Sequence, residues 1–222
     1  MIPLHDDNPT RSISIITIAL IAVCGAVFLV QVTAEPRAAI ELIYRFGVIP
    51  TVLLGDAELP EALGALPAWA TVVSSMFLHG GWLHMLGNML YLWLFGNNIE
   101  DAMGHGRFVV FYLVCGILAT LAHGIAEPGS EIPTIGASGA ISGVLGAYLV
   151  LYPRARVLVL IFLGFFVQTV RLPAVIVLGF WIVLQLFSAV TQSAEASGVA
   201  VFAHIGGFVA GMALINLFKR GV

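Results

Sequence analysis

The sequence predicts an all-α integral membrane protein, built as a bundle of six transmembrane helices. Of its 222 residues, 60% are hydrophobic and only 9% are charged, whereas a soluble domain carries about 25% charged residues. The hydrophobic residues are gathered into separate runs, and a helix needs roughly 20 apolar residues to cross a bilayer. We therefore expect residues 1–222 to form a single membrane domain.

Six runs fit the length of a membrane span. A further run, 157–167, is apolar but only 11 residues long and is bracketed by Arg154, Arg156 and Arg171. We expect it to form an interfacial or re-entrant hairpin rather than a seventh span. The six predicted spans are about 13–32, 80–96, 107–126, 136–152, 173–190 and 199–218.

The positive charges predict the orientation of these spans. With both termini in the cytoplasm, only Arg37 and Arg45 of the nine Lys and Arg residues face outward, in agreement with the positive-inside rule. The seven others are Arg11, Arg107, Arg154, Arg156, Arg171, Lys219 and Arg220. The short leader lacks a clear cleavage site, so the first run is expected to stay as a span. These features fit a multi-pass protein of a bacterial plasma membrane.

A long outer loop, residues 33–72, joins the first two predicted spans. It holds four prolines and five acidic residues among scattered apolar ones. Such a long connection is uncommon, and its mixed composition predicts partial immersion at the membrane interface. Shorter outward turns are expected at 127–135 and 191–198. The net charge of −3 is too small to indicate a nucleic-acid partner, and two cysteines in apolar spans indicate no disulfide framework.

Four polar residues at similar depth indicate a site inside the membrane. His84 and Asn88 lie early in the second predicted span, Ser138 early in the fourth and His204 early in the sixth. At about 1.5 Å per residue, all four fall within roughly 4–12 Å of the outer helix ends. Any one of them alone would be read as helix–helix hydrogen bonding or back-bonding. Four at one depth favour a functional site, because unpaired polar groups are costly there.

The residue types predict nucleophilic chemistry. Ser138 opens a helix, where free N–H groups and the helix dipole favour the negative charge of a developing oxyanion. His204 is expected to be the general base. His84 and Asn88 share a helix face and add donors to the oxyanion hole. Since no Asp or Glu lies inside the predicted spans, the site is predicted to be a Ser–His dyad.

Small residues predict close packing of the fourth and sixth spans. Their small-xxx-small spacing lets helices approach closely, which would bring the serine and the histidine within hydrogen-bond reach. The small residues of this pattern, with the glycine that precedes Ser138, are Gly136, Gly139, Gly143, Ala203, Gly207 and Gly211.

These motifs together resemble the rhomboid intramembrane serine proteases. The match comprises H-x-x-x-N at 84–88, G-x-S-G at 136–139 and A-H-x-x-G-x-x-x-G at 203–211, within a six-span core from about residue 40 to 218. The resemblance implies that Ser138 is the nucleophile and His204 the base. It also implies that His84, Asn88 and the Ser138 backbone line the oxyanion hole. Glu100 would be a structural hydrogen-bonding residue.

The resemblance further implies a serine endopeptidase that cleaves single-span membrane proteins near the outer membrane face. Its partners would be those substrates and membrane lipid, and it needs neither a cofactor nor a metal. A scissile bond in a helix must first unwind, so substrates with small or helix-breaking residues are expected. The fifth span, 173–190, is bulky and poor in glycine, and we expect it to be the lateral gate.

The chain departs from some family members at two positions. Trp69 has no Arg beside it in the outer loop, and Ser142 stands where some members have a Tyr that stacks on the catalytic His. We expect another aromatic residue to orient the His204 ring.

Two other function classes fit the sequence less well. A non-catalytic relative that guides transmembrane helices would lack the Ser or the His, yet this chain has both. A transporter or metal channel built on His79, His84, His123 and His204 would need carboxylate or thiolate ligands at suitable spacing. No carboxylate or thiolate joins these histidines at suitable spacing, and the predicted spans contain no acidic residue of the kind that ion transport favours.

Overall fold

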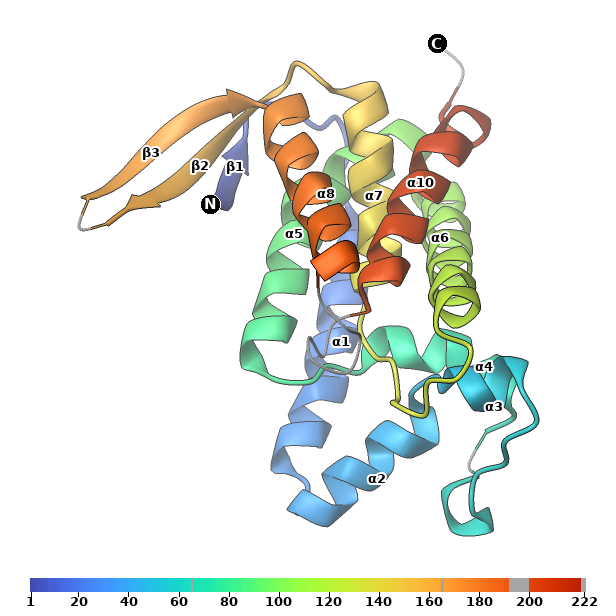
Figure 1. Ribbon diagram of the computed structural model, residues 1–222. Coiled ribbons are helices and arrows are strands. Elements are labelled where there is room, and N and C mark those ends of the chain that lie inside the picture. The colour runs from blue at the N-terminus through green and yellow to red at the C-terminus, as the bar shows by residue number, and fades with distance from the viewer. Residues whose placement is uncertain (65, 165, 192–199, 221–222) are drawn as a thin grey trace.

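The computed structural model describes residues 1–64, 66–164, 166–191 and 200–220, and it is mostly helical (Figure 1). Six helices coincide with the six predicted spans: α1 (Ile15–Thr33), α5 (Trp82–Met103), α6 (His105–Ala126), α7 (Ser138–Leu151), α8 (Ala174–Thr191) and α10 (Val201–Phe218). Among the described residues, α1, α6, α8 and α10 are each long and apolar enough to cross a membrane, and a sharply bent pair of segments that ends in α5 makes a fifth if it is counted as one span.

The remaining one of the six helices, α7, is too short to cross a bilayer. Its 14 residues rise about 21 Å at 1.5 Å each, against a hydrocarbon core of about 30 Å. Its residues from Gly139 to Tyr148 are all buried inside the protein. The crossing of the membrane by six helices therefore stays a prediction.

The segment between α1 and α5 is built from short helices. α2 (Pro36–Phe46) and α3 (Pro50–Leu54) each begin with a proline, the residue that best tolerates the first helical position. Next come η1 (Glu61–Leu63), α4 (Ala68–Ser74) and η2 (Ser75–Phe77). In Figure 1, α2, α3 and α4 lie at the end of the bundle where α5, α7 and α10 begin. Of the turn expected at 191–198, residues 192–198 lie outside the described ranges.

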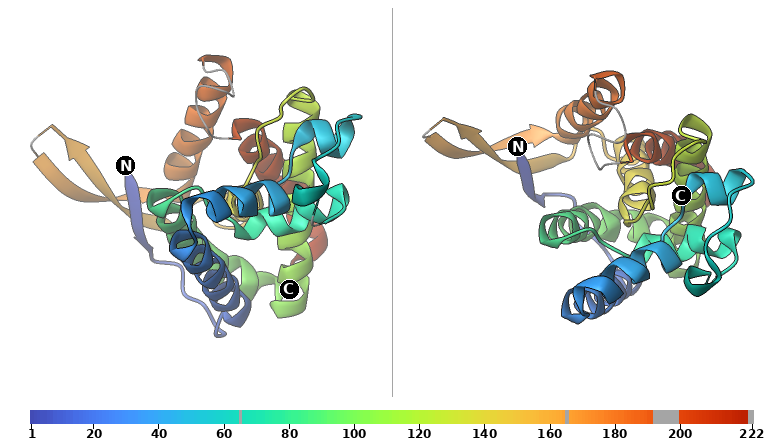
Figure 2. Two further views of the ribbon diagram at one scale, coloured as in Figure 1. Left: turned by 90° about the horizontal axis from the view of Figure 1, so that it is seen from below. Right: turned by 60° about the horizontal axis from the view of Figure 1, so that its bottom comes forward.

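A three-stranded antiparallel sheet corrects the prediction of an all-α fold. β2 (Arg156–Leu163) and β3 (Phe166–Pro173) form the hairpin expected near 157–167, and β1 (Ile2–Asp6) pairs with β2. Valine, isoleucine and phenylalanine are frequent in this run and favour strands, while 11 residues are too few for a spanning helix. Figure 2 shows the hairpin projecting away from the helices.

Polar contacts fasten the N-terminal strand to the helices. The buried Asp6 carboxylate accepts hydrogen bonds from the Tyr148 hydroxyl (2.6 Å) and the Asn98 amide (3.0 Å). Burial raises the pKa of Asp6, and the Tyr148 hydrogen bond acts in the opposite direction. Asp101 accepts from the backbone N–H groups of Arg11 and Ser12 at 3.1 and 3.0 Å. The leader is therefore an ordered part of the domain.

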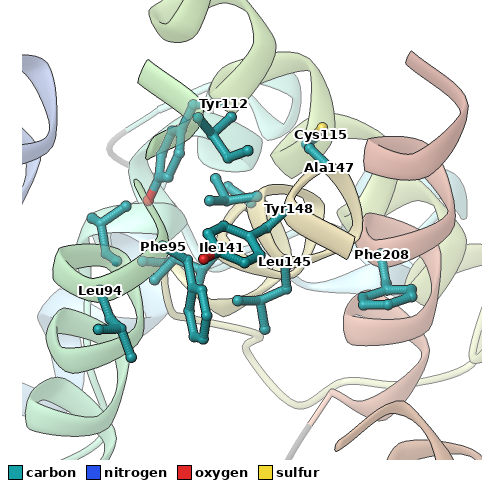
Figure 3. Close-up of a cluster of buried hydrophobic side chains, with 14 of the residues drawn as sticks. Leu94, Phe95, Tyr112, Cys115, Ile141, Leu145, Ala147, Tyr148 and Phe208 are labelled. Carbon is teal, nitrogen blue, oxygen red and sulfur yellow. The ribbon is translucent and has the colours of Figure 1, made fainter. Parts of the chain in front are cut away.

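The hydrophobic core surrounds α7. This helix contacts α5, α6, α8 and α10, and Figure 3 shows side chains of several helices gathered around it. The labelled members are Leu94 and Phe95 of α5, Tyr112 and Cys115 of α6, Ile141, Leu145, Ala147 and Tyr148 of α7, and Phe208 of α10.

Glycines bring the backbones of α7 and α10 into contact. A methyl group added at Gly207 would overlap the carbonyl oxygen of Gly139, and one added at Gly211 would overlap that of Gly143. A backbone carbonyl cannot rotate away as a side chain can, so both positions require glycine at this separation. Gly146 of α7 is in the same situation, because a methyl group added there would overlap the carbonyl oxygen of Phe208 in α10.

We expect Gly211→Ala to lower stability by about 1–3 kcal/mol, the usual effect of overfilling a packed core. The matched control is Gly179→Ala in α8, where an added methyl meets nothing within 4 Å. That variant should be neutral or slightly stabilising, because alanine is the better helix former. Thermal unfolding in detergent measures both, and equal melting temperatures for the two variants would contradict the contact.

Candidate active site

Ser138 and His204 are joined by a hydrogen bond. The distance from the Ser138 Oγ to the His204 Nε2 is 2.7 Å, although the two residues are 66 positions apart in the chain. Ser138 is the first residue of α7, and His204 lies in the first turn of α10. The glycine contact between these helices holds the two side chains at this distance.

A cavity opens at this pair. Its volume is about 710 Å³, and its walls include all four polar residues that the sequence singled out, Ser138, His204, His84 and Asn88. The pocket also has small residues in its lining, such as Gly116, Ala119 and Gly139. A volume in this range can hold a short stretch of peptide or a drug-sized molecule.

His84 is oriented toward Ser138 by its own loop. The backbone N–H of Gly80 donates to the His84 Nδ1 at 3.2 Å, so a neutral ring carries its proton on Nε2. A methyl group at Gly136 would lie 2.8 Å from the Nε2 and the Cε1 of His84. Gly136 also has φ +127°, a conformation that glycine adopts more readily than other residues. His84 therefore presents an N–H donor beside Ser138.

Asn88 offers a second donor to the cavity. Its side chain is buried, with 8% of its surface exposed, and the amide nitrogen has no hydrogen-bond partner within the described residues. Buried amide groups are normally paired. Because Asn88 lines the cavity, its amide is a candidate donor to a group bound there.

α8 holds the other side of His204, which the sequence did not predict. The Trp181 ring lies 5.9 Å from the His204 ring, centroid to centroid, at an interplanar angle of 40°. The His204 Nδ1 lies 2.8 Å from the Gln185 Oε1. Trp181 thus takes the place of the aromatic residue that is missing at Ser142, whose hydroxyl instead donates to the Ser138 carbonyl at 2.6 Å. In the sequence, the one sign of this contact was Gln185, a lone glutamine in an apolar span, where such residues often bond between helices.

The turn before α5 is fixed by a residue of α1. The Gln31 side chain accepts from the His79 N–H at 3.0 Å and donates to the His79 carbonyl at 3.2 Å. The His79 ring is buried beside the His84 ring, 5.2 Å away between centroids. His79 itself does not line the cavity, so Gln31 and His79 support His84 from behind.

Glu100 lies far from the cavity, at the other end of α5. It is fully buried, and its carboxylate accepts hydrogen bonds from the backbone N–H groups of Ile16 and Thr17 at 2.9 and 2.8 Å. The Thr17 hydroxyl donates at 2.7 Å, and His105 lies 2.6 Å away. Since Ile16 and Thr17 are in the first turn of α1, Glu100 caps that helix. A carboxylate there also complements the helix dipole.

The arrangement has the parts of an acyl-transfer site: a hydroxyl nucleophile, an imidazole within hydrogen-bond distance, and N–H donors around one cavity. Within the described ranges, no three His, Cys, Asp or Glu side chains converge as metal ligands would.

Known proteins resemble this chain over most of its length. The family model described as "Rhomboid domain" matches residues 67–221. The rhomboid protease GluP of Bacillus subtilis is 34% identical over 185 residues, which are 82% of this chain and 31% of GluP. The chloroplastic rhomboid-like protein 11 of Arabidopsis thaliana is 26% identical over 164 residues, 69% of this chain and 54% of that protein.

A third relative, the mitochondrial rhomboid protein 1 of Saccharomyces cerevisiae, is 34% identical over 96 residues, 41% of this chain and 28% of that protein. The chain thus spans between about a quarter and just over half the length of these relatives. The family model covers more than half of the chain. Four helices in the described part of the chain are long and apolar enough to cross a membrane. The chain is therefore an integral membrane protein that belongs to the rhomboid family.

Proposed function

We propose that this chain is an intramembrane serine endopeptidase that cleaves transmembrane segments of membrane proteins near the outer membrane face. The observation that carries the proposal is the 2.7 Å contact between the Ser138 Oγ and the His204 Nε2 at the cavity wall. A serine hydroxyl is a weak nucleophile until a neighbouring base accepts its proton. His204 is the base within reach of Ser138.

In this mechanism the Ser138 Oγ attacks the carbonyl carbon of the scissile bond while the His204 Nε2 accepts the hydroxyl proton. The carbonyl oxygen becomes an oxyanion. The C–N bond then breaks, and the His204 Nε2 returns the proton to the leaving amine. A water molecule repeats the sequence on the acyl-enzyme, and Ser138 recovers its proton.

The oxyanion is stabilised by donors that are already in place. His84 supplies its Nε2–H, Asn88 supplies its unpaired side-chain amide, and the start of α7 supplies backbone N–H groups at Ser138. Donors fixed before the reaction need no reorganisation when the charge develops. No cofactor or metal takes part in these steps.

The short central helix supports access for both water and substrate. With six membrane crossings and both termini in the cytoplasm, the end of the bundle that carries α2–α4 faces outward. α7 begins inside the bundle at that end, so the cavity lies below the outer surface.

Single-span substrate helices would reach the cavity between α5 and α8. α8 suits a gate, because only Ala174, Val177 and Leu178, near one of its ends, are buried.

Cleavage in liposomes tests the proposal. Wild-type protein should cut a single-span substrate with small or helix-breaking residues near its outer end. Ser138→Ala and His204→Ala should each lower the rate by at least about 1,000-fold, as loss of a dyad member does in serine proteases. Ser142→Ala is the matched control, since its hydroxyl is committed to the Ser138 carbonyl, and it should keep most of the activity. Equal cleavage by wild type and Ser138→Ala would refute the mechanism.

We expect Asn88→Ala to lower kcat by about 100- to 1,000-fold with little change in KM, because an oxyanion donor acts mainly in the transition state. Asn97→Ala makes the same change on the same helix, away from this cavity, and should leave kcat near the wild-type value. A raised KM at unchanged kcat in Asn88→Ala would instead make Asn88 a ground-state substrate contact.

A further inference from the structure

We propose that Gln185 of α8 is a positioning residue, which holds His204 in the tautomer that accepts the Ser138 proton and so links catalysis to the placement of α8. The inference rests on the proposed function and adds a third side chain to the Ser–His pair. Gln185 is not itself part of the cavity lining. It acts through His204.

The two ring nitrogens of His204 each have one partner. The Nε2 lies 2.7 Å from the Ser138 Oγ, and the Nδ1 lies 2.8 Å from the Gln185 Oε1. A neutral imidazole carries one N–H and one lone pair. The Gln185 oxygen can only accept a hydrogen bond, so the proton belongs on Nδ1. The lone pair is then on Nε2, facing the hydroxyl from which it must take a proton.

The same contact serves the charged state of the ring. When the Nε2 accepts the Ser138 proton, both nitrogens carry N–H groups and the ring is positive. The Gln185 oxygen continues to accept from the Nδ1–H, and its partial negative charge stabilises the imidazolium. An amide gives this support without placing an ionised carboxylate in an apolar bundle, where an isolated charge is far more costly. The sequences of α8 and α10 contain no Asp or Glu.

Trp181 completes the support from α8. It is four residues before Gln185, so both side chains project from one face of the helix. The Trp181 ring packs on the His204 ring (5.9 Å) and on the Phe208 ring (5.8 Å). One face of α8 therefore supplies both a hydrogen-bond acceptor for His204, from Gln185, and an aromatic ring that packs on it, from Trp181.

The rest of α8 is held to the bundle mainly at its first turns. Its buried residues are Ala174, Val177 and Leu178, while Val183, Phe187 and Val190 are 58%, 64% and 87% exposed. An outward displacement of α8 beyond these turns would carry Gln185 and Trp181 away from His204. The base is then fully oriented only while α8 is packed against α10.

Kinetics and nuclear magnetic resonance test the role of Gln185. Gln185→Leu removes the acceptor at similar volume, and we expect kcat in liposomes to fall about tenfold, the usual weight of one hydrogen bond, with KM within twofold of wild type. Gln185→Glu keeps an acceptor oxygen, and its carboxyl is paired with the His204 ring rather than isolated, so it should keep most of the wild-type kcat. Thr191→Val on the same helix is the control, because among the residues that the structure describes the Thr191 hydroxyl donates only to the Phe187 carbonyl of its own helix, and its kcat should be unchanged.

The tautomer of His204 can be measured in the wild type, so this test does not depend on whether a Gln185 variant folds. In wild type labelled with ¹⁵N-histidine, the His204 ring should show its proton on Nδ1, assigned by its loss in His204→Ala. That Nδ1–H signal should broaden or vanish in Gln185→Leu. A proton on Nε2 in the wild type, or an unchanged kcat in folded Gln185→Leu, would overturn the role of Gln185 alone. A folded wild type that cleaves no substrate would overturn the proposed function and this inference together.

Discussion

The backbone contact between α7 and α10 is the constraint on which the rest of the structure depends. Gly207 and Gly211 lie against the carbonyl oxygens of Gly139 and Gly143, so the two helices approach more closely than any side chain would allow. Between apolar helices in lipid, such close packing is a main source of association energy. It also holds Ser138 and His204, which lie in the first turns of these two helices, at hydrogen-bonding distance. Fold stability and the chemistry of the site thus share one interface.

Glu100, Asp6 and Asn88 are three buried polar residues that differ in their hydrogen bonds. Glu100 has its carboxylate shared among N–H and hydroxyl donors of α1, and Asp6 accepts from Tyr148 and Asn98. Both join segments distant in sequence. Asn88 differs, because its amide is unpaired beside an open cavity. Because an unpaired polar group is costly in such surroundings, the place of Asn88 at the cavity makes its amide a candidate contact for a ligand.

The sequence was sufficient to predict the six long helices and four of the polar residues around the cavity. Spans appear as apolar runs, and Ser138, His204, His84 and Asn88 could be brought together because each lies early in a predicted span. The prediction of an all-α fold was wrong at Ile2–Asp6 and at 156–173. Local composition does not reveal that an N-terminal polar leader will pair with a distant hairpin, since tertiary contacts such as those of Asp6 with Tyr148 and Asn98 fix it.

The support of His204 was also beyond the sequence. Trp181 and Gln185 lie on a helix that carries no recognisable motif, and their role depends on which face of α8 meets α10. A bulky residue and a lone amide in an apolar run are consistent with either the lipid side or the protein side. Sequence spacing shows that they share a face, and the structure shows that this face meets His204.

Labelling by a fluorophosphonate probe tests the central claim most directly, because the probe reacts with a serine only when its hydroxyl is activated. Purified, detergent-solubilised wild type should be labelled, and folded Ser138→Ala and His204→Ala should not. That result would mean that Ser138 is the nucleophile and that His204 activates it. Equal labelling of all three proteins, or none of folded wild type, would contradict the account.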